Sequence, residues 1–275
     1  MLKVLCHVTV GCEDPNHGDR NFSESVSTCK NRQHDPRGPL VQLPDTFFDQ
    51  FSTDLAVALL GKVIRHLVVH KGRAVWLSAR IIETEAYAIY DKASHASLGY
   101  TAKRAALFMA PGTIYMYYAR GGDSLNVSAR GQGNAVLIKS GYPFADRQSP
   151  VSTQQVMLLN NPIHRPPRSV AAGPASAPRP LARVCAGQTL LCRALGLRVA
   201  EWDQHQFDPA RFYFDDVGYE PTRWIQCSRL GITSGRDEDL PWRFVDATYA
   251  RVCSKNPLTR RNPDYLIHSG STRPK

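Results

Sequence analysis

The sequence predicts a single domain of mixed α/β (α+β) class, in which helices surround a curved and mainly antiparallel sheet. Its 275 residues suit one fairly large domain with tails, and 43% of them are apolar, which is enough for a core. Strand-like runs follow one another across short turns, which indicates antiparallel neighbours. Helical periodicity occurs at Leu55–Leu60, before these runs, and at Leu190–Leu195, after them.

The first predicted element is a helix near the start of the folded region, which begins around Leu43. Thr53 or Asp54 can cap its first turn with a side-chain oxygen. Apolar residues then recur at helical spacing as far as Leu60, and Gly61 supplies the usual end signal.

Strand-like runs rich in β-branched and aromatic residues occupy the middle of the chain. The clearest are Val63–His70, Val75–Tyr87, Ile114–Ala119, Leu125–Ser128 and Ala135–Lys139. A Lys-Gly-Arg turn separates the first two, and a Gly-Gln-Gly segment between the last two is a hairpin signal. Short strands and turns are expected again across 211–245.

Composition divides the chain into a central domain at 43–250 and two tails. Residues 1–42 carry five acids and five bases and lack a strand or helix period, so we expect a disordered N-terminal tail. Residues 251–275 are expected to form a mobile C-terminal tail. Within the domain, 160–183 holds six prolines, four arginines and no acid. It is predicted to be a surface loop that either touches phosphates or is simply solvated.

The charge balance favours an anionic partner. Lys and Arg outnumber Asp and Glu by 34 to 24, a net charge of +10 that lies within 43–275. This favours nucleic acid, although solubility alone also selects basic chains. No apolar run is long enough to span a bilayer, and the start is too short and polar for a secretory signal. We therefore expect a protein that is not secreted and keeps its seven cysteines as thiols.

Two acidic residues near the end of a predicted strand are the first candidates for chemistry. Side chains two apart in a strand share a face, so Glu83, Glu85 and Tyr87 are expected to project together. Such carboxylates suit a hydrolytic pair, or one base beside one structural acid. A solvated polar face is the alternative.

Aromatic and polar residues downstream meet the needs of a pocket for a flat base. Tyr115 and Tyr117 share one face of a predicted strand, and His95 and Asn126 precede and follow that strand. Aromatic rings, an amide and a carboxylate are the groups that a base-flipping site uses. Tyrosines at alternate positions are also common in ordinary cores.

With these residues in place, the chain resembles the alkyladenine (3-methyladenine) DNA glycosylase family, the type without a helix-hairpin-helix motif. The similar region runs from about Leu43 to Val245. The matching motifs, in order, are Phe47-Phe48-Asp49, Leu59-Leu60-Gly61-Lys62, Ile82-Glu83-Thr84-Glu85-Ala86-Tyr87, Met109-Ala110-Pro111-Gly112-Thr113-Ile114-Tyr115, Leu125-Asn126-Val127-Ser128, Val136-Leu137-Ile138-Lys139, Leu191-Cys192-Arg193-Ala194-Leu195-Gly196, Arg229-Leu230-Gly231-Ile232 and Pro241-Trp242-Arg243-Phe244. Their number and order argue against chance similarity.

The resemblance implies a role for each pocket residue. It makes Glu85 the general base that activates water. Tyr87 and His95 would stack on or contact the flipped base, and Tyr117 would close the pocket from the other side. Asn126 would lie at the floor and crowd the amino group of normal guanine. A purine N-glycosidic bond breaks through an oxocarbenium-like state, so a carboxylate that activates water suits this chemistry.

The chain departs from the family pattern at two places. Lys139 stands where well-studied members have a water-positioning arginine, and lysine keeps the charge but lacks the planar fork. It also leaves open a minor Schiff-base lyase activity. The loop that carries an intercalating tyrosine in many members is one residue shorter here, so Arg120 or Tyr118 is expected to fill the gap left by the flipped nucleotide. Glu83 is expected to support the site rather than to catalyse.

The expected function is that of a monofunctional DNA glycosylase in base excision repair. It would flip alkylated or deaminated purines, such as 3-methyladenine, 7-methylguanine, hypoxanthine and ethenoadenine, and hydrolyse them off. Two alternatives remain. One is a non-catalytic damaged-DNA-binding module of the same fold, and the other is an N-glycosidase that acts on nucleosides or RNA.

The expected partner is double-stranded DNA that contains a damaged purine, with a protruding hairpin inserted into the duplex. Water is the only co-substrate, so neither a metal nor an organic cofactor is expected. We expect no membrane association and no obligate protein partner, and the composition favours a monomer. The compartment would be the cytoplasm, at the nucleoid, in a bacterium or the nucleus in a eukaryote.

Overall fold

The computed structural model describes residues 41–119, 121–164, 176–259 and 264–270. The helices are α1 (Ser52–Ala58), α2 (Gln154–Asn160), α3 (Gln188–Leu195) and α4 (Val199–Trp202). The strands are β1 (Val63–His70), β2 (Arg73–Tyr87), β3 (Ile114–Ala119), β4 (Gly122–Ser128), β5 (Ala135–Pro143), β6 (Ile163–His164), β7 (Ser176–Ala177), β8 (Phe212–Asp215), β9 (Arg223–Cys227), β10 (Arg243–Asp246) and β11 (Tyr265–Ser269). Short 3₁₀ segments lie at Asp45–Phe48, His95–Leu98, Ala102–Phe108, Val151–Thr153, Leu181–Arg183 and Ala247–Tyr249.

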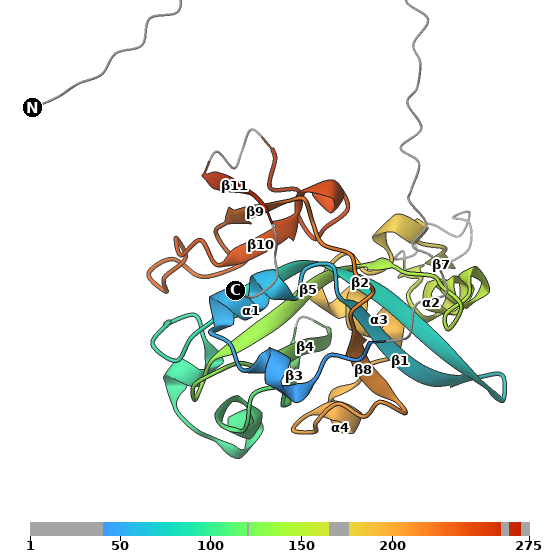
Figure 1. The fold of residues 1–275 in the computed structure, drawn as a ribbon, viewed down its shortest axis with the longest axis horizontal. Coiled ribbons are helices and arrows are strands. Elements are labelled where there is room, and N and C mark those ends of the chain that lie inside the picture. The colour runs from blue at the N-terminus through green and yellow to red at the C-terminus, as the bar shows by residue number, and fades with distance from the viewer. Residues whose placement is uncertain (1–40, 120, 165–175, 260–263, 271–275) are drawn as a thin grey trace, which may run out of the picture. The chain divides into compact units, whose positions relative to one another are not determined.

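A large antiparallel sheet organises the described part of the chain. Its strand order is β11-β9-β10-β2-β5-β4-β3, with β1 paired to β2 and β8 paired to β1. In Figure 1, β9, β10 and β11 lie together at one end of this sheet, away from β3 and β4. The predicted fold class, mixed α/β with a mainly antiparallel sheet, is confirmed, and the sheet is open rather than closed into a barrel.

The β1–β2 hairpin follows from local sequence chemistry. Lys71 and Gly72 both have positive φ, at 50° and 74°, which is the backbone conformation that two-residue hairpin turns need. Pairing then runs without interruption from His70 opposite Arg73 to Val63 opposite Arg80. The predicted bounds of β1 are confirmed, and β2 begins at Arg73, two residues before the predicted start.

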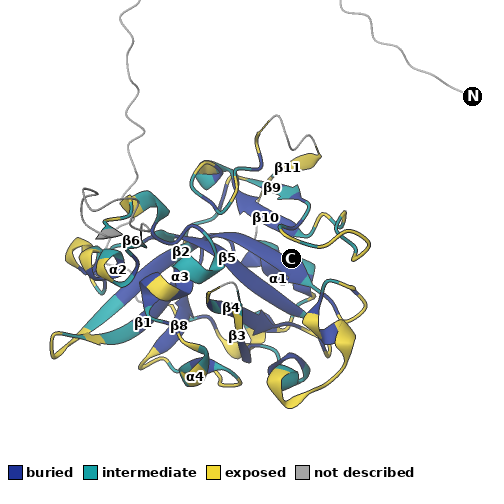
Figure 2. Cartoon of the chain, turned by 180° about the vertical axis from the view of Figure 1, so that it is seen from behind, coloured by how far each residue is buried: buried dark blue, intermediate teal, exposed yellow. Residues whose placement is uncertain are grey.

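The core lies where alternating strand residues meet α1 and α3. Apolar side chains on one face of β3, β4 and β5 are fully or almost fully buried. They are Ile114, Met116, Leu125, Val127, Val136 and Ile138. Each such side chain stabilises the fold by roughly 1.5–3 kcal/mol. In Figure 2 the buried colour covers the central strands and the exposed colour is concentrated in loops.

Helix α1 differs from its prediction at the first turn. It begins at Ser52 after the extended residue Phe51, and neither Thr53 nor Asp54 caps it through a side chain. Its buried face packs on β2 and β5, and the hydroxyl of Thr84 on β2 donates to the carbonyl of Ala56, 2.7 Å away. Packing against the sheet therefore places this helix without a side-chain cap.

The segments expected to be loop or tail also acquire structure where they are described. In 160–183, β6 and β7 form a separate two-stranded sheet, and 165–175 lies outside the described residues. Near the C-terminus, β11 pairs with β9 along its whole length, where the sequence predicted a mobile tail. The predicted N-terminal tail lies outside the described residues, apart from 41–42. Within the described ranges, no helix combines the length and apolar character needed to cross a membrane.

A local irregularity in the long strand β2 shapes the site. The register between β2 and β5 shifts between Ile81 and Glu83 and again between Glu83 and Thr84. Ser140 lies opposite Glu83 and Ile138 opposite Thr84, so Lys139 falls at the irregularity. Bulges of this kind redirect side chains and are common beside active sites.

Candidate active site

A row of paired residues across four strands forms the base of the site. Tyr115 on β3 lies opposite Asn126 on β4, Asn126 lies opposite Leu137 on β5, and Leu137 lies opposite Glu85 on β2. Directly paired residues share a face of the sheet, and so do residues two apart. Tyr117 and Tyr87 therefore join this face. The sheet brings together the residues that the sequence suggested separately.

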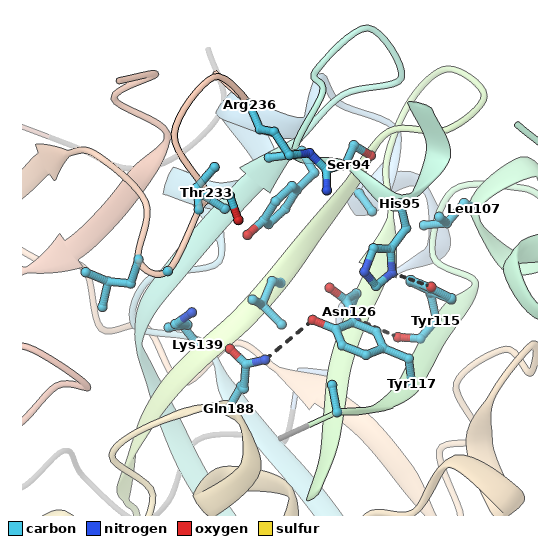
Figure 3. Close-up of a pocket in the computed structure, with 18 residues that line it drawn as sticks. Ser94, His95, Leu107, Tyr115, Tyr117, Asn126, Lys139, Gln188, Thr233 and Arg236 are labelled. Atoms are coloured by element: carbon cyan, nitrogen blue, oxygen red, sulfur yellow. Dashed lines mark hydrogen bonds between the residues drawn. The ribbon is translucent and has the colours of Figure 1, made fainter. Parts of the chain in front are cut away.

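A cavity of about 210 Å³ lies over this row. That is smaller than the roughly 300–1,000 Å³ of pockets for drug-sized ligands, so the cavity suits a group of about the size of one base. Its predicted members are Tyr87, His95, Tyr117, Asn126 and Lys139. Figure 3 shows His95 and Tyr117 on one side of the cavity and Lys139 on the other.

The Glu85 carboxylate lies just beneath the cavity wall and is fully buried. Its Oε1 accepts from the backbone N–H of Leu230 at 3.0 Å, and its Oε2 accepts from the hydroxyl of Tyr87 at 2.8 Å. The Lys139 Nζ lies 3.2 Å from Oε1 and 3.3 Å from Oε2. The carboxylate thus accepts three hydrogen bonds, and the single Lys139 ammonium pairs with both of its oxygens. Each of the three partner residues lines the cavity.

Lys139 lies two residues after Leu137, the partner of Glu85, so its side chain is on the same face of the sheet as Glu85. Its side chain is almost completely buried and ends between the two carboxylate oxygens. Glu83, by contrast, turns to a different set of partners outside the cavity lining. It pairs with Arg243 at 2.6 Å and accepts hydrogen bonds from Ser140 and Ser254. The sequence predicts a supporting rather than a catalytic role for Glu83, and none of these partners is among the residues that line the cavity.

Three aromatic side chains form one wall of the cavity. The rings of His95 and Tyr117 are 4.7 Å apart at an angle of 64°, and the Nδ1 of His95 is hydrogen-bonded to the hydroxyl of Tyr115 at 2.8 Å. Burial, aided by Arg104 and Arg236, lowers the pKa of His95. His95 is therefore neutral at pH 7.

Tyr87 also lines the cavity, and its ring is supported by a cation. The guanidinium of Arg229 lies 4.6 Å from the centre of the Tyr87 ring. Arg229 is held in turn by a buried ion pair with Asp91 and a hydrogen bond to the carbonyl of Ala86. Burial, followed by the nearby Glu85 carboxylate, raises the pKa of Tyr87 well above its ordinary value. The hydroxyl thus stays protonated and donates to Glu85.

Asn126 lines the cavity with its amide fixed. Its Nδ2 donates to the carbonyl of Tyr115 at 3.0 Å, and only 5% of the residue is exposed. The side chain cannot rotate freely without losing this bond, so it is a rigid feature of the cavity.

Sequence reasoning missed several residues of the site. Gln188, at the start of α3, lines the cavity, as do Thr233 and Arg236 from the loop after β9. The motif that contains Arg229 and Leu230 was recognised, but nothing in it indicated that the Leu230 N–H donates to Glu85. Gln188 belongs to none of the recognised motifs, so no sequence signal indicated its place in the cavity.

Of the two predicted wedge residues, Tyr118 is the one that the structure describes, near the end of β3. Tyr118 is 70% exposed and lines a groove next to the cavity together with Lys103 and Arg104. Arg120 lies outside the described residues. The geometry therefore offers an exposed aromatic ring beside the cavity, with positive charge close to it.

Comparison with known proteins adds independent evidence. Residues 46–250 match the family model of methylpurine-DNA glycosylase. A protein of Pseudomonas aeruginosa is 58% identical over 218 residues, which is 79% of this chain and 85% of that protein. One of Pseudomonas savastanoi is 58% identical over 228 residues, 82% and 96% of the two chains, and one of Methanocella arvoryzae is 30% identical over 220 residues, 78% and 97%. All three are described as candidate 3-methyladenine DNA glycosylases.

The family model covers well over half of the chain, and the motifs that it spans build the cavity described above. A hydrolase of this kind acts on N-glycosyl bonds, which agrees with a buried carboxylate beside a pocket of one-base size. The chain therefore belongs to the methylpurine-DNA glycosylase family and is a DNA glycosylase.

Proposed function

We propose that the protein is a monofunctional glycosylase that removes damaged purines from duplex DNA, with Glu85 as the general base. The observation that carries this proposal is the placement of the Glu85 carboxylate. It lies directly behind the cavity and contacts three residues that line it, namely Tyr87, Lys139 and Leu230. A water at this wall would be next to both a proton acceptor and the sugar of a base held in the cavity.

In the proposed reaction, water attacks C1′ of the flipped nucleotide. The C1′–O bond forms as the C1′–N bond breaks, and the electron pair of that bond leaves with the base. Glu85 takes one proton from the water, and its negative charge stabilises the oxocarbenium-like transition state. The carboxylate accepts three hydrogen bonds, so the water can take its remaining acceptor position, next to the ammonium of Lys139.

Lys139 is proposed to hold this water rather than to act as a nucleophile. Its ammonium contacts both oxygens of Glu85. An ammonium in an ion pair has no lone pair for attack on C1′, so a Schiff-base route is disfavoured. The ammonium also lacks the planar pair of N–H donors that a guanidinium directs at one partner, so it holds the water through a single hydrogen bond.

The walls of the cavity are proposed to select the base. Tyr87 on one side and His95 with Tyr117 on the other would hold a flat purine between aromatic rings. The fixed amide of Asn126 would crowd the exocyclic amino group of undamaged guanine. Alkylated and deaminated purines, such as 3-methyladenine, 7-methylguanine, hypoxanthine and ethenoadenine, are the proposed substrates. Outside the cavity, Tyr118 is proposed to fill the space that the flipped nucleotide leaves.

Excision assays on defined duplexes test this function. Oligonucleotides with one ethenoadenine, hypoxanthine or 7-methylguanine are incubated with the purified protein and then treated with alkali. Breaks that appear only after alkali are the expected result, because hydrolysis leaves an intact abasic strand. Breaks before alkali would indicate lyase chemistry at Lys139. Binding of the lesion duplex with no abasic product would contradict the proposed reaction.

His95 gives the proposed function a specific dependence on pH. Its pKa lies below the ordinary value of about 6.5, so the ring is neutral at pH 7 and gains a proton only in more acidic solution. A protonated ring would repel a cationic base such as 7-methylguanine, but not neutral hypoxanthine. We expect the ratio of 7-methylguanine to hypoxanthine excision to fall as pH drops below 6.5.

A variant that cannot titrate provides the control for this effect. His95→Asn keeps a polar group near the Tyr115 hydroxyl without a titratable ring. Single-turnover rates of the wild type and of the variant are measured on both lesions between pH 5 and 8. The same pH dependence of the ratio in both proteins would show that His95 is not responsible.

A further inference from the structure

Gln188 presents a polar group to the cavity that the reaction described so far does not use. It is half-buried at the first position of α3, and its Nε2 donates to the Ser124 Oγ at 3.0 Å and to the Tyr117 hydroxyl at 3.4 Å. Figure 3 shows the amide nitrogen directed to Tyr117 and the amide oxygen directed to the interior, on the side where Lys139 lies. This oxygen accepts no hydrogen bond from a described residue.

The Gln188 amide lies against two hydroxyl groups on neighbouring strands. Ser124 belongs to β4 and Tyr117 to β3, and the two residues lie directly opposite one another in the sheet. The amide therefore rests on two hydroxyl groups fixed by a rigid element. Support from two such groups restricts the rotamer of the side chain.

The attacking water needs a hydrogen-bond acceptor that Glu85 cannot supply. Water has two O–H bonds, and one of them must point at the Glu85 carboxylate that takes the proton. The other needs its own acceptor, or the water rotates and loses its alignment with C1′. Glu85 already accepts three hydrogen bonds, from Leu230, Tyr87 and Lys139, so one of its about four acceptor positions is left for the water.

We propose that Gln188 is a catalytic residue whose Oε1 accepts the second hydrogen bond of the attacking water, opposite Glu85. This inference rests on the proposed function. The Lys139 ammonium would then donate a hydrogen bond to one lone pair of the water oxygen, while Glu85 and Gln188 each accept one of its O–H bonds. Three contacts from three elements, β2, β5 and α3, fix the oxygen lone pair that attacks C1′. Gln188 thus supplies the second fixed point that a lysine, unlike an arginine, does not offer.

Two substitutions at this position separate the acceptor oxygen from the shape of the side chain. Gln188→Met keeps nearly the same volume but has no amide, and it is expected to lower the single-turnover rate of hypoxanthine excision at least about tenfold. Gln188→Glu keeps an acceptor oxygen, and the Ser124 and Tyr117 hydroxyls can turn to donate to it. The Glu variant is therefore expected to stay within about threefold of the wild type.

Competition with methanol distinguishes a contact to water from a structural role. Methanol has a single O–H, which Glu85 deprotonates, so methanol attack needs no second acceptor. In a water–methanol mixture, the products are the free abasic sugar and its methyl glycoside. The fraction of methyl glycoside is expected to rise several-fold in Gln188→Met relative to the wild type. Loosening of Tyr117 or of α3 would slow both products together and leave the fraction unchanged.

The outcomes assign failure to one proposal or the other. If the wild type leaves all three lesions intact, the proposed function is wrong. If the wild type excises them but Gln188→Met stays within twofold of its rate, Gln188 does not act on the water. A slow Gln188→Met variant with an unchanged methyl glycoside fraction, or a Gln188→Glu variant as slow as Gln188→Met, also overturns the inference.

Discussion

Replacing Glu85 with Gln is expected to lower the rate of base excision by a factor on the order of 10²–10⁴, the usual contribution of a general base. The amide has nearly the same shape but cannot take a proton from water. The single carbonyl oxygen of the amide can still accept a hydrogen bond from the Leu230 N–H or from the Tyr87 hydroxyl, which both donate to the carboxylate in the wild type. Lys139 loses its counterion but lines the cavity, where solvent can reach its ammonium, so the cavity should keep its shape and the variant should bind lesion duplex within a few-fold of the wild type.

Single-turnover excision with enzyme in excess measures this effect, because it reports the chemical step without product release. Glu201→Gln is a matched control. Glu201 lies on α4 and forms a solvent-exposed ion pair with Arg211, so the variant makes the same acid-to-amide change away from the cavity. The control should excise hypoxanthine and ethenoadenine at the wild-type rate. Excision by Glu85→Gln at the wild-type rate would show that another group activates the water.

The local parts of this molecule were predictable from the sequence because their causes are local. The turn at Lys71 and Gly72 and the alternation in the strand before Tyr87 depend on a few neighbouring residues. The register that places Tyr115, Asn126 and Glu85 in one row depends on hydrogen bonds among four strands. No pattern in a single strand carries that information.

The features that were missed depend on contacts between distant segments. Arg229 and Asp91 are 138 residues apart in the chain, yet together they support the Tyr87 ring. The register irregularity beside Lys139 has no clear sequence signal. Gln188 reaches the cavity only because of the way α3 packs on β4 and β5. Strand β11 was missed because its apolar stretch is short and lies among polar residues and prolines.

Replacing Glu83 with Gln is expected to destabilise the fold by about 3–5 kcal/mol, the usual cost of removing one partner of a buried ion pair. Glu83 and Arg243 are both fully or almost fully buried, and the Nε of Arg243 lies 2.6 Å from the Glu83 Oε1. The amide leaves the Arg243 charge without its counterion. For a domain of this size, the melting temperature should fall by roughly 6–20 °C.

Thermal unfolding and its dependence on pH distinguish this role from catalysis. Burial alone would raise the pKa of Glu83, but Arg243 and hydrogen bonds from Ser140 and Ser254 lower it below its ordinary value. The folded protein thus binds this proton more weakly than the unfolded chain. The stabilisation is present above a pH of about 4.3 and is lost as the pH falls below it. Glu83→Gln should lack this part of the acid sensitivity.

A double variant shows whether the loss of stability in Glu83→Gln comes from the unpaired charge of Arg243. Adding Arg243→Met to Glu83→Gln removes the buried cation, and it should recover part of the lost stability, because an apolar replacement of a buried pair is often nearly neutral. Excision, measured well below the melting temperature, should stay close to the wild-type rate in Glu83→Gln, since Glu83 contacts none of the cavity residues that hold Glu85. Loss of excision in a folded Glu83→Gln protein would instead place this second carboxylate in the reaction.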